Sequence, residues 1–328
     1  MKKAVDAVNT LSRFLADESI TGAKGLNEFF QSLPTSLADD DIQSAQPVDA
    51  VVFCASSVLS LADAVFSAFS GSSTPDGTIA DKKIALHGRN TILVLCGGIG
   101  HSTPFLYEAI AKHPTYNKLA SEVEGKPESR VLQMIAERWF GLRALDVGSA
   151  GSKLLPGDRD RLLIVVEDKS TNCGANASES RKVLEACGVP SPRSIVVVQD
   201  PTMSKRTVAT FEKTYSNSPG VKPRVTSWPT FTPEVLVNLA GSAGGGQEDP
   251  LAHLEYFKAH QTSTQYSGLW DMRRFVDLLM GEIPRLRDDA SGYGPNGKGF
   301  LVHVDIPEEV EDAWKHLDGI LGKDKRDR

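Results

Sequence analysis

The sequence has few cysteines, and they form no redox or metal-binding motif. Four cysteines occur in 328 residues without a C-x-x-C pair, which argues against a disulfide framework. Cys54 and Cys96 lie inside apolar, β-branched runs, where we expect each to be a small core residue. This usage is typical of a reducing compartment, so we predict a cytoplasmic protein.

Neither sign of charge is in large excess. A formal net charge of −6 gives no overall attraction to nucleic acid or to anionic membranes, and we predict no nucleic-acid partner. The tail from Lys323 to Arg328 is basic but contains Asp324 and Asp327, and we interpret it as a solvated, frayed end. The composition, with 40% hydrophobic and 24% charged residues, is that of an ordinary globular protein.

Long apolar runs are missing as well. The first twenty residues include Asp6, Asp17 and Glu18 and lack the apolar core of a secretory signal. The most apolar stretch, Ala50 to Phe69, contains Asp63 and several serines, and it fits a strand followed by a helix better than a membrane span. We therefore predict a soluble chain without an integral membrane segment, and the sequence leaves its oligomeric state open.

Several signatures of catalysis and metal binding are absent. The seven histidines show no metal-ligand spacing, so we predict no metal site. The chain also lacks the G-x-S-x-G motif of a nucleophile elbow. We interpret His113 and His303 as structural, which leaves His101 as the histidine inside a candidate ligand-binding motif.

The chain does contain a regular alternation of apolar runs and helical segments. Short runs that are almost continuous in Val, Ile and Leu are typical of strands buried on both faces. The predicted strands are Val48–Cys54, Thr91–Cys96, Leu162–Val166 and Ser194–Val198, with Val221–Trp228 as a candidate fifth. The predicted helices are Leu59–Phe69, Glu128–Phe140, Ser178–Ala186 and about Ser204–Tyr215. This alternation predicts an α/β fold with a parallel sheet that helices cover on both faces.

The pattern changes on either side of this region. We divide the chain into a helical lead-in (1–46), an α/β ligand-binding domain (47–230) and a smaller C-terminal cap (231–328). The cap is predicted to contain a flexible linker at Gly241–Asp249, a helix at Leu269–Leu286, a strand at Phe300–Val304 and a helix at Pro307–Leu321.

Three polar motifs each follow a predicted strand, where ligands bind in open parallel sheets. The first runs from Gly97 to Thr103 and begins Gly-Gly-Ile-Gly. Glycine lets the backbone approach a ligand closely, and the amides at the start of the next helix favour an anion. Thr103 occupies the place of the last glycine in a dinucleotide fingerprint, and no P-loop lysine follows. A tight strand-to-helix turn is the alternative interpretation.

The second motif runs from Glu167 to Asn176. Its two adjacent carboxylates could bind ribose hydroxyls, hold an amine or act as a base. The alternative is structural: Ser170 and Asn172 would cap a helix, and the acidic pair would belong to a solvated turn.

The third motif runs from Gln199 to Thr207. Lys205 and Arg206 fall in the first turn of a predicted helix, where positive charge opposes the helix dipole. We therefore expect an anion, or Asp200, to lie near them. The alternative is that both side chains point into solvent.

Taken together, the motifs resemble the YdcF family, within the wider group of bacterial YdcF-, SanA- and ElyC-like proteins that share a domain of unknown function. The resemblance covers about residues 45–320, and its C-terminal part is specific to the YdcF branch. The matching segments are GGIGHST at 97–103, FLYEAIAKHPTYN at 105–117, EDKSTNCGANA at 167–177, VVVQDPTM at 196–203, LWDMRRF at 269–275, EIPRLRDDASGYGP at 282–295 and HVDIP at 303–307.

The resemblance implies a Rossmann-like doubly wound sheet with a smaller, mainly helical C-terminal part. It also implies S-adenosylmethionine or a similar nucleotide as the ligand. The binding residues that it implies are Gly97, Gly98, Gly100, His101, Ser102, Glu167, Ser170, Asn172, Asn176, Asp200 and Arg206. Two features depart from the family: Ala175 stands where a Glu is common, and the segment Ser70 to Arg89 is longer than the family needs, which suggests a lid or a partner surface.

Three functions fit these motifs. The leading hypothesis is a protein that binds a ligand of the S-adenosylmethionine type, with transferase activity as one form of it. The second is an enzyme acting on a phosphate ester or a phosphorylated lipid carrier, in which Arg206 and the glycine turn clamp phosphate and Glu167 or His101 acts as acid or base. The third is a non-catalytic sensor, because one crevice can serve all three functions.

Overall fold

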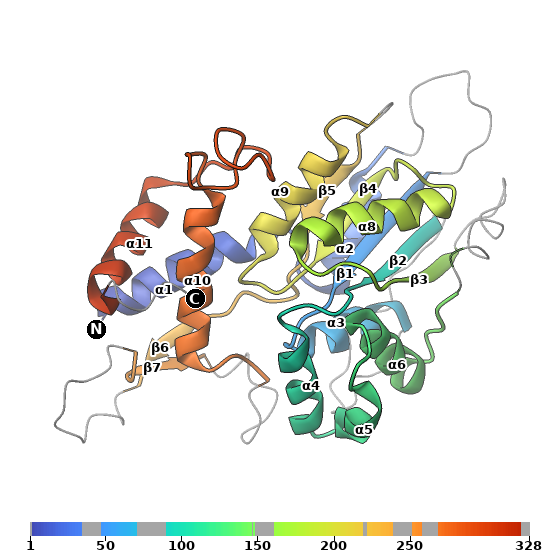
Figure 1. The fold of residues 1–328 in the computed structure, drawn as a ribbon, viewed down its shortest axis with the longest axis horizontal. Helices are drawn as coiled ribbons and strands as arrows, with labels where there is room; N and C mark the ends of the chain where they lie inside the picture. The colour runs from blue at the N-terminus through green and yellow to red at the C-terminus, as the bar shows by residue number, and fades with distance from the viewer. Residues whose placement is uncertain are drawn as a thin grey trace.

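A parallel sheet of five strands, in the order β3-β2-β1-β4-β5, forms the centre of the molecule (Figure 1). The computed structural model describes residues 2–34, 47–70, 90–145, 147, 161–218, 222–238, 251–257 and 268–322. The strands are β1 (Val48–Cys54), β2 (Asn90–Cys96), β3 (Leu162–Glu167), β4 (Ser194–Val198) and β5 (Arg224–Ser227). The predicted α/β fold is confirmed, and each predicted strand of the sheet is present with small shifts at its ends.

Both faces of the sheet are buried, which explains the continuous apolar runs. Val52 and Val94 belong to one apolar cluster, whereas Val51 and Leu93 belong to the other. Side chains alternate between the two faces of a strand, so a sheet covered on both faces has no polar face to interrupt the run. β1 and β2 are in register to their last residues, Cys54 and Cys96, so their following loops start side by side.

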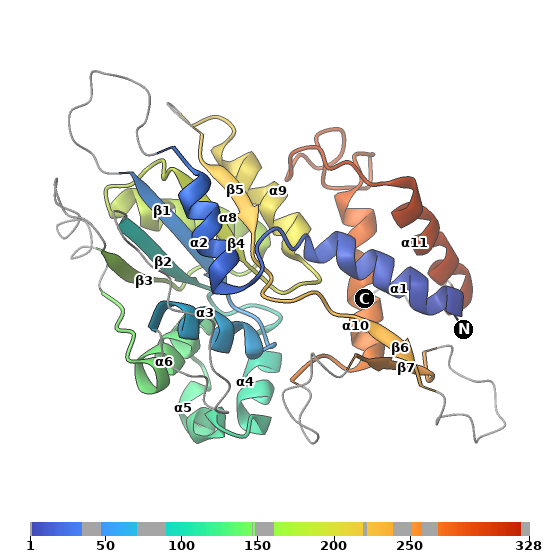
Figure 2. The same cartoon turned by 180° about the vertical axis from the view of Figure 1, so that it is seen from behind.

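Helices cover the sheet on each face (Figures 1 and 2). On one face lie α8 (Cys173–Ala186) and α9 (Ser204–Tyr215), and on the other lie α3 (Ser60–Ser70) and α6 (Glu128–Phe140), with α2 (Gly22–Ser32) beside α3. The chain between β2 and β3 also forms α4 (Thr103–Lys112), the 3-10 turn η1 (Tyr116–Leu119) and α5 (Ala120–Val123). Helix α8 starts before the predicted Ser178, because Asn172 caps it by accepting a hydrogen bond from the Ala175 N–H at 3.0 Å.

The two ends of the chain pack together at one side of the sheet (Figure 1). Helix α1 (Lys2–Ala16) packs against α10 (Met272–Leu286) and α11 (Glu308–Leu321), and it also contacts α9. A short antiparallel ribbon, β6 (Val235–Val237) with β7 (Leu254–Tyr256), lies next to α1. Sequence analysis missed this ribbon because strands of three residues carry too little periodicity to be recognised.

The predicted strand at Phe300–Val304 is wrong, because these residues pair with no strand of the described structure. The N–H groups of Phe300 and Leu301 instead donate to the Tyr293 carbonyl at 2.9 and 3.0 Å. The apolar residues of this run therefore close a glycine-rich loop between α10 and α11.

Helix α10 continues past a proline because a second helix supplies the missing hydrogen bond. Pro284 has no N–H, so the carbonyl of Met280 has no donor within α10. The indole N–H of Trp314, on α11, donates to that carbonyl at 2.9 Å. This contact also fixes α10 against α11.

Some predictions concern residues outside the described ranges, namely the long segment up to Arg89, the linker at 241–249 and the tail at 323–328. Within those ranges, no helix is both long enough and apolar enough to cross a membrane.

Candidate functional site

The carboxyl ends of β1 and β4 mark the place where a sheet of this strand order is expected to bind a ligand. β2 and β3 lie on one side of β1, and β4 and β5 lie on the other. The loops after β1 and β4 therefore turn away in opposite directions, which opens a crevice in sheets of this order. At its mouth the hydroxyl of Ser56, two residues after β1, donates to Oδ2 of Asp200 at 3.0 Å.

Asp200 is a buried carboxyl group held by hydroxyl and amide donors. Its Oδ1 accepts from the N–H and the hydroxyl of Thr202, at 3.0 and 2.6 Å, and the side chain is only 4% exposed. Burial raises the pKa of Asp200 above its ordinary value, although these hydrogen bonds act in the opposite direction. Sequence analysis named Asp200 but not Ser56. The polar pair after the strand, Ser56 and Ser57, was the signal for it.

The glycine turn after β2 packs closely against the loop after β3. The N–H groups of Gly97 and Gly98 donate to the carbonyls of Glu167 and Ser170, at 3.0 and 2.6 Å. A Cβ atom on Gly98 would lie 2.5 Å from the Ser170 carbonyl oxygen, and one on Gly100 would lie 2.8 Å from the Thr171 carbonyl oxygen. The close backbone approach that the sequence suggested for a ligand is made in this structure by the neighbouring loop.

The carboxylate of Glu167 points inward and holds its own loop. Oε1 accepts from the N–H groups of Lys169 and Ser170, at 2.6 and 2.9 Å. Oε2 accepts from the Ser170 hydroxyl and from the Cys96 thiol, whose pKa is raised by burial. Both oxygens of Glu167 are thus used by the protein, and its predicted catalytic role stays a prediction.

The other residues of these two motifs lie around the same edge. Asn172 is exposed and caps α8, as the structural alternative proposed, whereas Ser170 bonds to Glu167 and is not a cap. Asn176 is half-buried in the first turns of α8. His101 is exposed just before α4.

Glu128 is a buried carboxyl group of this edge that sequence analysis missed. Its Oε1 accepts from the hydroxyls of Ser102 and Thr103 at 3.0 and 2.9 Å, and its backbone N–H donates to the Gly98 carbonyl at 3.1 Å. Burial raises its pKa above the ordinary value. The residue stands in the first turn of α6, after Pro127, where an acidic residue is also an ordinary helix start, so the sequence gave it no distinction.

Arg206 is compensated by a carboxylate from a distant part of the chain. Its guanidinium forms a two-point ion pair with Glu282 of α10, and the Nη2–Oε1 distance is 3.0 Å. Lys205 pairs with Asp17 at 2.9 Å. The carboxylates beside these cations are therefore Glu282 and Asp17 and not Asp200, and the alternative that both cations point into solvent is wrong. A bound anion near them stays a prediction. Folding brings α1 and α10 to α9 and supplies both carboxylates.

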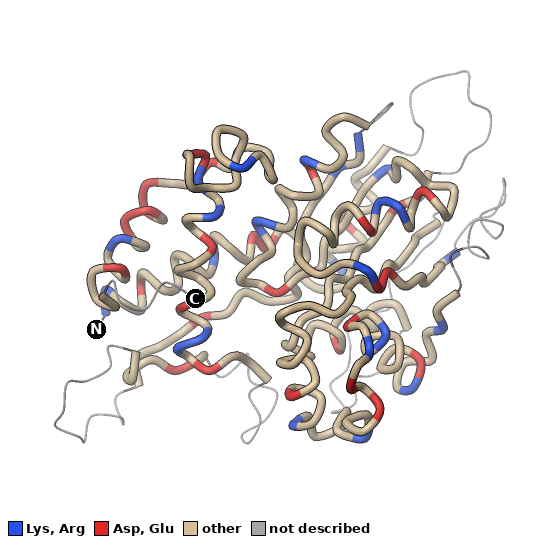
Figure 3. Tube along the Cα trace, viewed as in Figure 1, with Lys and Arg blue, Asp and Glu red and all other residues tan. Residues whose placement is uncertain are grey.

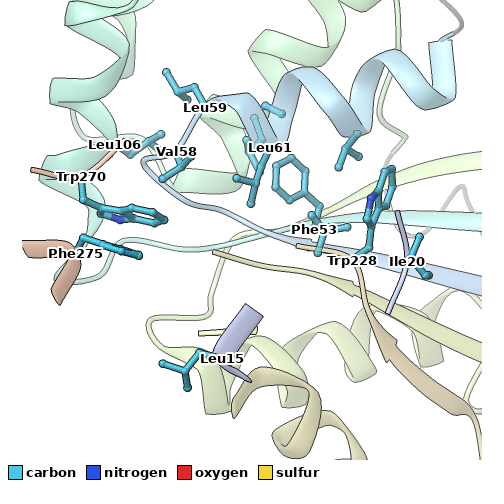
Figure 4. Packing of buried hydrophobic residues seen from close by; sticks show 14 of the residues in the cluster. Leu15, Ile20, Phe53, Val58, Leu59, Leu61, Leu106, Trp228, Trp270 and Phe275 are labelled. Atoms are coloured by element: carbon cyan, nitrogen blue, oxygen red, sulfur yellow. The ribbon is translucent and has the colours of Figure 1, made fainter. Parts of the chain in front are cut away.

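A cavity of about 460 Å³ adjoins the crevice. Its walls include Ser57 and Val58 after β1, Phe105 of α4, and Trp270 and Arg274 at the start of α10. The Arg274 guanidinium lies 3.5 Å from the centre of the Phe105 ring, which joins the two sides of the cavity. Figure 4 shows Trp270 and Phe275 beside Val58 and Leu106, where the start of α10 meets the loop after β1 and helix α4.

The charges of the molecule are mixed, and acidic and basic residues alternate along many of its elements (Figure 3). In the part of the chain that the structure describes, no group of three or more His, Cys, Asp and Glu residues could hold a metal ion. No protein-family model matches the chain.

Proposed function

We propose that this chain binds a small nucleotide-like molecule of the S-adenosylmethionine type in the crevice between β1 and β4. The hydrogen bond between Ser56 and Asp200 at the mouth of that crevice is the observation that carries the proposal. In this view the sheet is of the Rossmann-like doubly wound type and the protein is YdcF-like, since the strand order matches that type as far as β5.

The adjoining cavity has the chemistry that such a ligand needs. S-adenosylmethionine combines a flat base, a ribose, a sulfonium cation and an amino acid group. Phe105 and Trp270 offer aromatic surface to the base, while Asp271 and Arg274 offer one charge of each sign to the amino acid group. The buried carboxyl group of Asp200 favours a ligand that carries positive charge, because a nearby cation stabilises its ionised form.

The phosphate alternative has lost its main support. In that alternative Arg206 binds the phosphate, but the Arg206 guanidinium forms an ion pair with Glu282. The amides of Gly97, Gly98 and Gly100 are engaged too, by two carbonyls and by the Thr103 hydroxyl. A phosphate would have to displace these contacts.

Binding is better supported than acid–base catalysis. A general base is normally oriented by a second group and faces the substrate. Glu167 faces the interior, whereas His101 is exposed, and among the described residues no hydrogen bond orients its ring. We therefore infer a ligand-binding protein, and a transferase reaction would have to draw its chemistry from the ligand itself.

Calorimetric titration of the whole chain tests this proposal. We expect S-adenosylmethionine to bind, and Asp200→Asn to weaken binding by at least about tenfold, or about 1.4 kcal/mol, because it removes the charge but keeps the shape. Asp312→Asn, at an exposed aspartate of α11, is the matched control and should leave affinity unchanged.

The same titrations include p-nitrophenyl phosphate as a phosphate ester. Binding of the ester without binding of S-adenosylmethionine would favour the phosphate alternative. If both aspartate variants bind S-adenosylmethionine like the unchanged chain, the crevice between β1 and β4 is not the site.

A further inference from the structure

A second and larger cavity lies in the C-terminal part of the molecule, away from the edge of the sheet. It measures about 750 Å³, within the range of small-molecule pockets, and it lies among α10, the glycine-rich loop and α11. Much of its wall is apolar or aromatic, including Leu278, Met280, Pro284, Tyr293 and Trp314. Such a wall suits the apolar body of an organic ligand.

The polar part of the wall is predominantly basic. Four basic side chains but only two carboxylates line the cavity, and one of those carboxylates, Asp277, is 3.6 Å from Arg273. The other, Asp271, caps α10 by accepting from the Arg274 N–H at 2.9 Å. An excess of positive charge therefore remains.

The remaining basic groups lack carboxylates of their own. Arg274 and Lys298 lie over the rings of Phe105 and Tyr293, and neither pairs with a carboxylate within the described ranges. Arg285 lies 3.5 Å from Glu282, but that carboxylate already forms its two-point pair with Arg206. Two guanidinium groups thus share one carboxylate, and Arg285, which lines the cavity, is 39% exposed.

A glycine inside α10 makes room for this arrangement. Gly281 lines the cavity, and the Arg285 guanidinium donates a hydrogen bond to the Gly281 carbonyl, one turn earlier in the helix. A Cβ atom on Gly281 would lie 2.7 Å from Nη1 of Arg285. Glycine costs a helix about 1 kcal/mol relative to alanine, and this position has no positive φ that would require it. The open cavity and the placement of Arg285 give it a reason.

We propose that this cavity is a second ligand site, which binds an organic anion: a carboxylate, phosphate or sulfonate group attached to an apolar body. The guanidinium groups match the oxygen geometry of such anions, and the aromatic and aliphatic wall receives the rest of the ligand. The site shares Asp271 and Arg274 with the cavity near the sheet, but Gly281, Arg285 and Lys298 line the second cavity alone, so variants at these three positions test it separately from the function proposed above.

Fluorescence titration with 8-anilinonaphthalene-1-sulfonate, an aromatic sulfonate, tests the proposal on the whole chain. We expect saturable binding to the folded protein. Gly281→Leu should abolish it, because the new side chain fills the cavity and displaces the flexible end of Arg285. The melting temperature should be kept or raised, since leucine favours a helix over glycine. The double variant Arg285→Gln/Lys298→Gln should weaken binding at least about tenfold. Lys315→Gln, an exposed lysine of α11, is the control and should bind like the unchanged chain.

A competition experiment identifies the preferred anion and distinguishes the second site from the one near the sheet. Dodecanoate and dodecyl phosphate should displace the dye, the better of the two indicating the head group, and uncharged dodecanol should displace it weakly or not at all. Asp200→Asn should bind the dye like the unchanged chain, whatever its affinity for S-adenosylmethionine. Equal displacement by dodecanol, or undiminished dye binding by folded Gly281→Leu, would overturn the proposal.

Discussion

At Gly98, a backbone carbonyl of the neighbouring loop occupies the space that a side chain would need. The Ser170 carbonyl oxygen lies 2.5 Å from the position of its Cβ atom, and it also accepts the Gly98 N–H at 2.6 Å. The loops after β2 and β3 are thereby joined at their closest point. The glycine requirement at this residue comes from packing between two loops of the protein, and it would hold without any ligand.

Gly98→Ala should therefore destabilise the protein by about 1–3 kcal/mol, because a methyl group must force the two loops apart. Urea denaturation gives the free energy of unfolding. Gly319→Ala is the matched control: Gly319 is in α11, a Cβ atom there meets nothing within 4 Å, and the change should stabilise the helix by up to about 1 kcal/mol. Equal stability of the two variants would contradict this account of Gly98.

Asp200 gives the stability of the protein a predictable dependence on pH. Burial raises its pKa above the ordinary value of 3.8. A carboxyl group with a higher pKa in the folded chain binds its proton more tightly there, so its ionisation near neutral pH costs stability, and that cost disappears as the pH falls toward 3.8.

Asp200→Asn removes this titration and keeps the size of the side chain. Near neutral pH the variant should be at least as stable as the unchanged chain, and the difference should move in favour of the unchanged chain as the pH falls from neutral toward 3.8. Melting temperatures of both proteins across that range measure it. A constant difference for Asp200→Asn would contradict the raised pKa.

At the scale of elements, helices α10 and α11 depend on each other through a proline. Pro284 removes the donor that the Met280 carbonyl would have in a regular helix, and the Trp314 indole replaces it at 2.9 Å. The Arg287 guanidinium also lies over the ring of this tryptophan, 4.5 Å from its centre. The Trp314 side chain thus completes the backbone hydrogen bonding of the neighbouring helix α10.

A double-mutant cycle tests this dependence. Trp314→Phe should cost about 1–3 kcal/mol of stability, largely because it leaves the Met280 carbonyl without a donor. In a Pro284→Ala background the alanine N–H can donate to that carbonyl, so the same Trp314→Phe change should cost less. Chemical denaturation of the four proteins gives the coupling energy, and a cost that is equal in both backgrounds would show that the hydrogen bond contributes nothing.

At the scale of the whole molecule, a buried ion pair joins α9, which covers the sheet, to α10 near the end of the chain. Arg206 of α9 and Glu282 of α10 are 14% and 4% exposed, and they are 76 residues apart in sequence. Two charges removed from water are stable only as a pair, so each holds the other element in place.

Glu282→Gln should accordingly destabilise the protein by about 3–5 kcal/mol, since it leaves Arg206 buried without a counter-charge. Replacing both residues with apolar ones, Arg206→Met together with Glu282→Leu, should recover much of that loss. Glu311→Gln breaks the more exposed pair with Arg287 and should cost about 1 kcal/mol or less. Chemical denaturation gives the free energy of unfolding of each variant. The claim holds only if Glu282→Gln lowers that free energy most.

The sequence by itself determined the α/β class and the positions of the sheet strands. Runs such as Ile195–Val198 are apolar throughout because both faces of the strand are buried, and that requirement can be recognised from the local sequence. The sequence also located the polar edge of the sheet, since the three motifs lie in the loops after β2, β3 and β4.

Only the tertiary structure decided what those polar residues contact. Glu167 holds its own loop, Gly98 meets Ser170, and Arg206 pairs with Glu282, although the sequence motifs read equally well as ligand contacts. A local pattern shows that a charge or a glycine needs a partner, but not whether the partner is a ligand or a distant part of the chain. That choice depends on which elements fold against each other, and here α10 reaches α9 through contacts that no local pattern encodes.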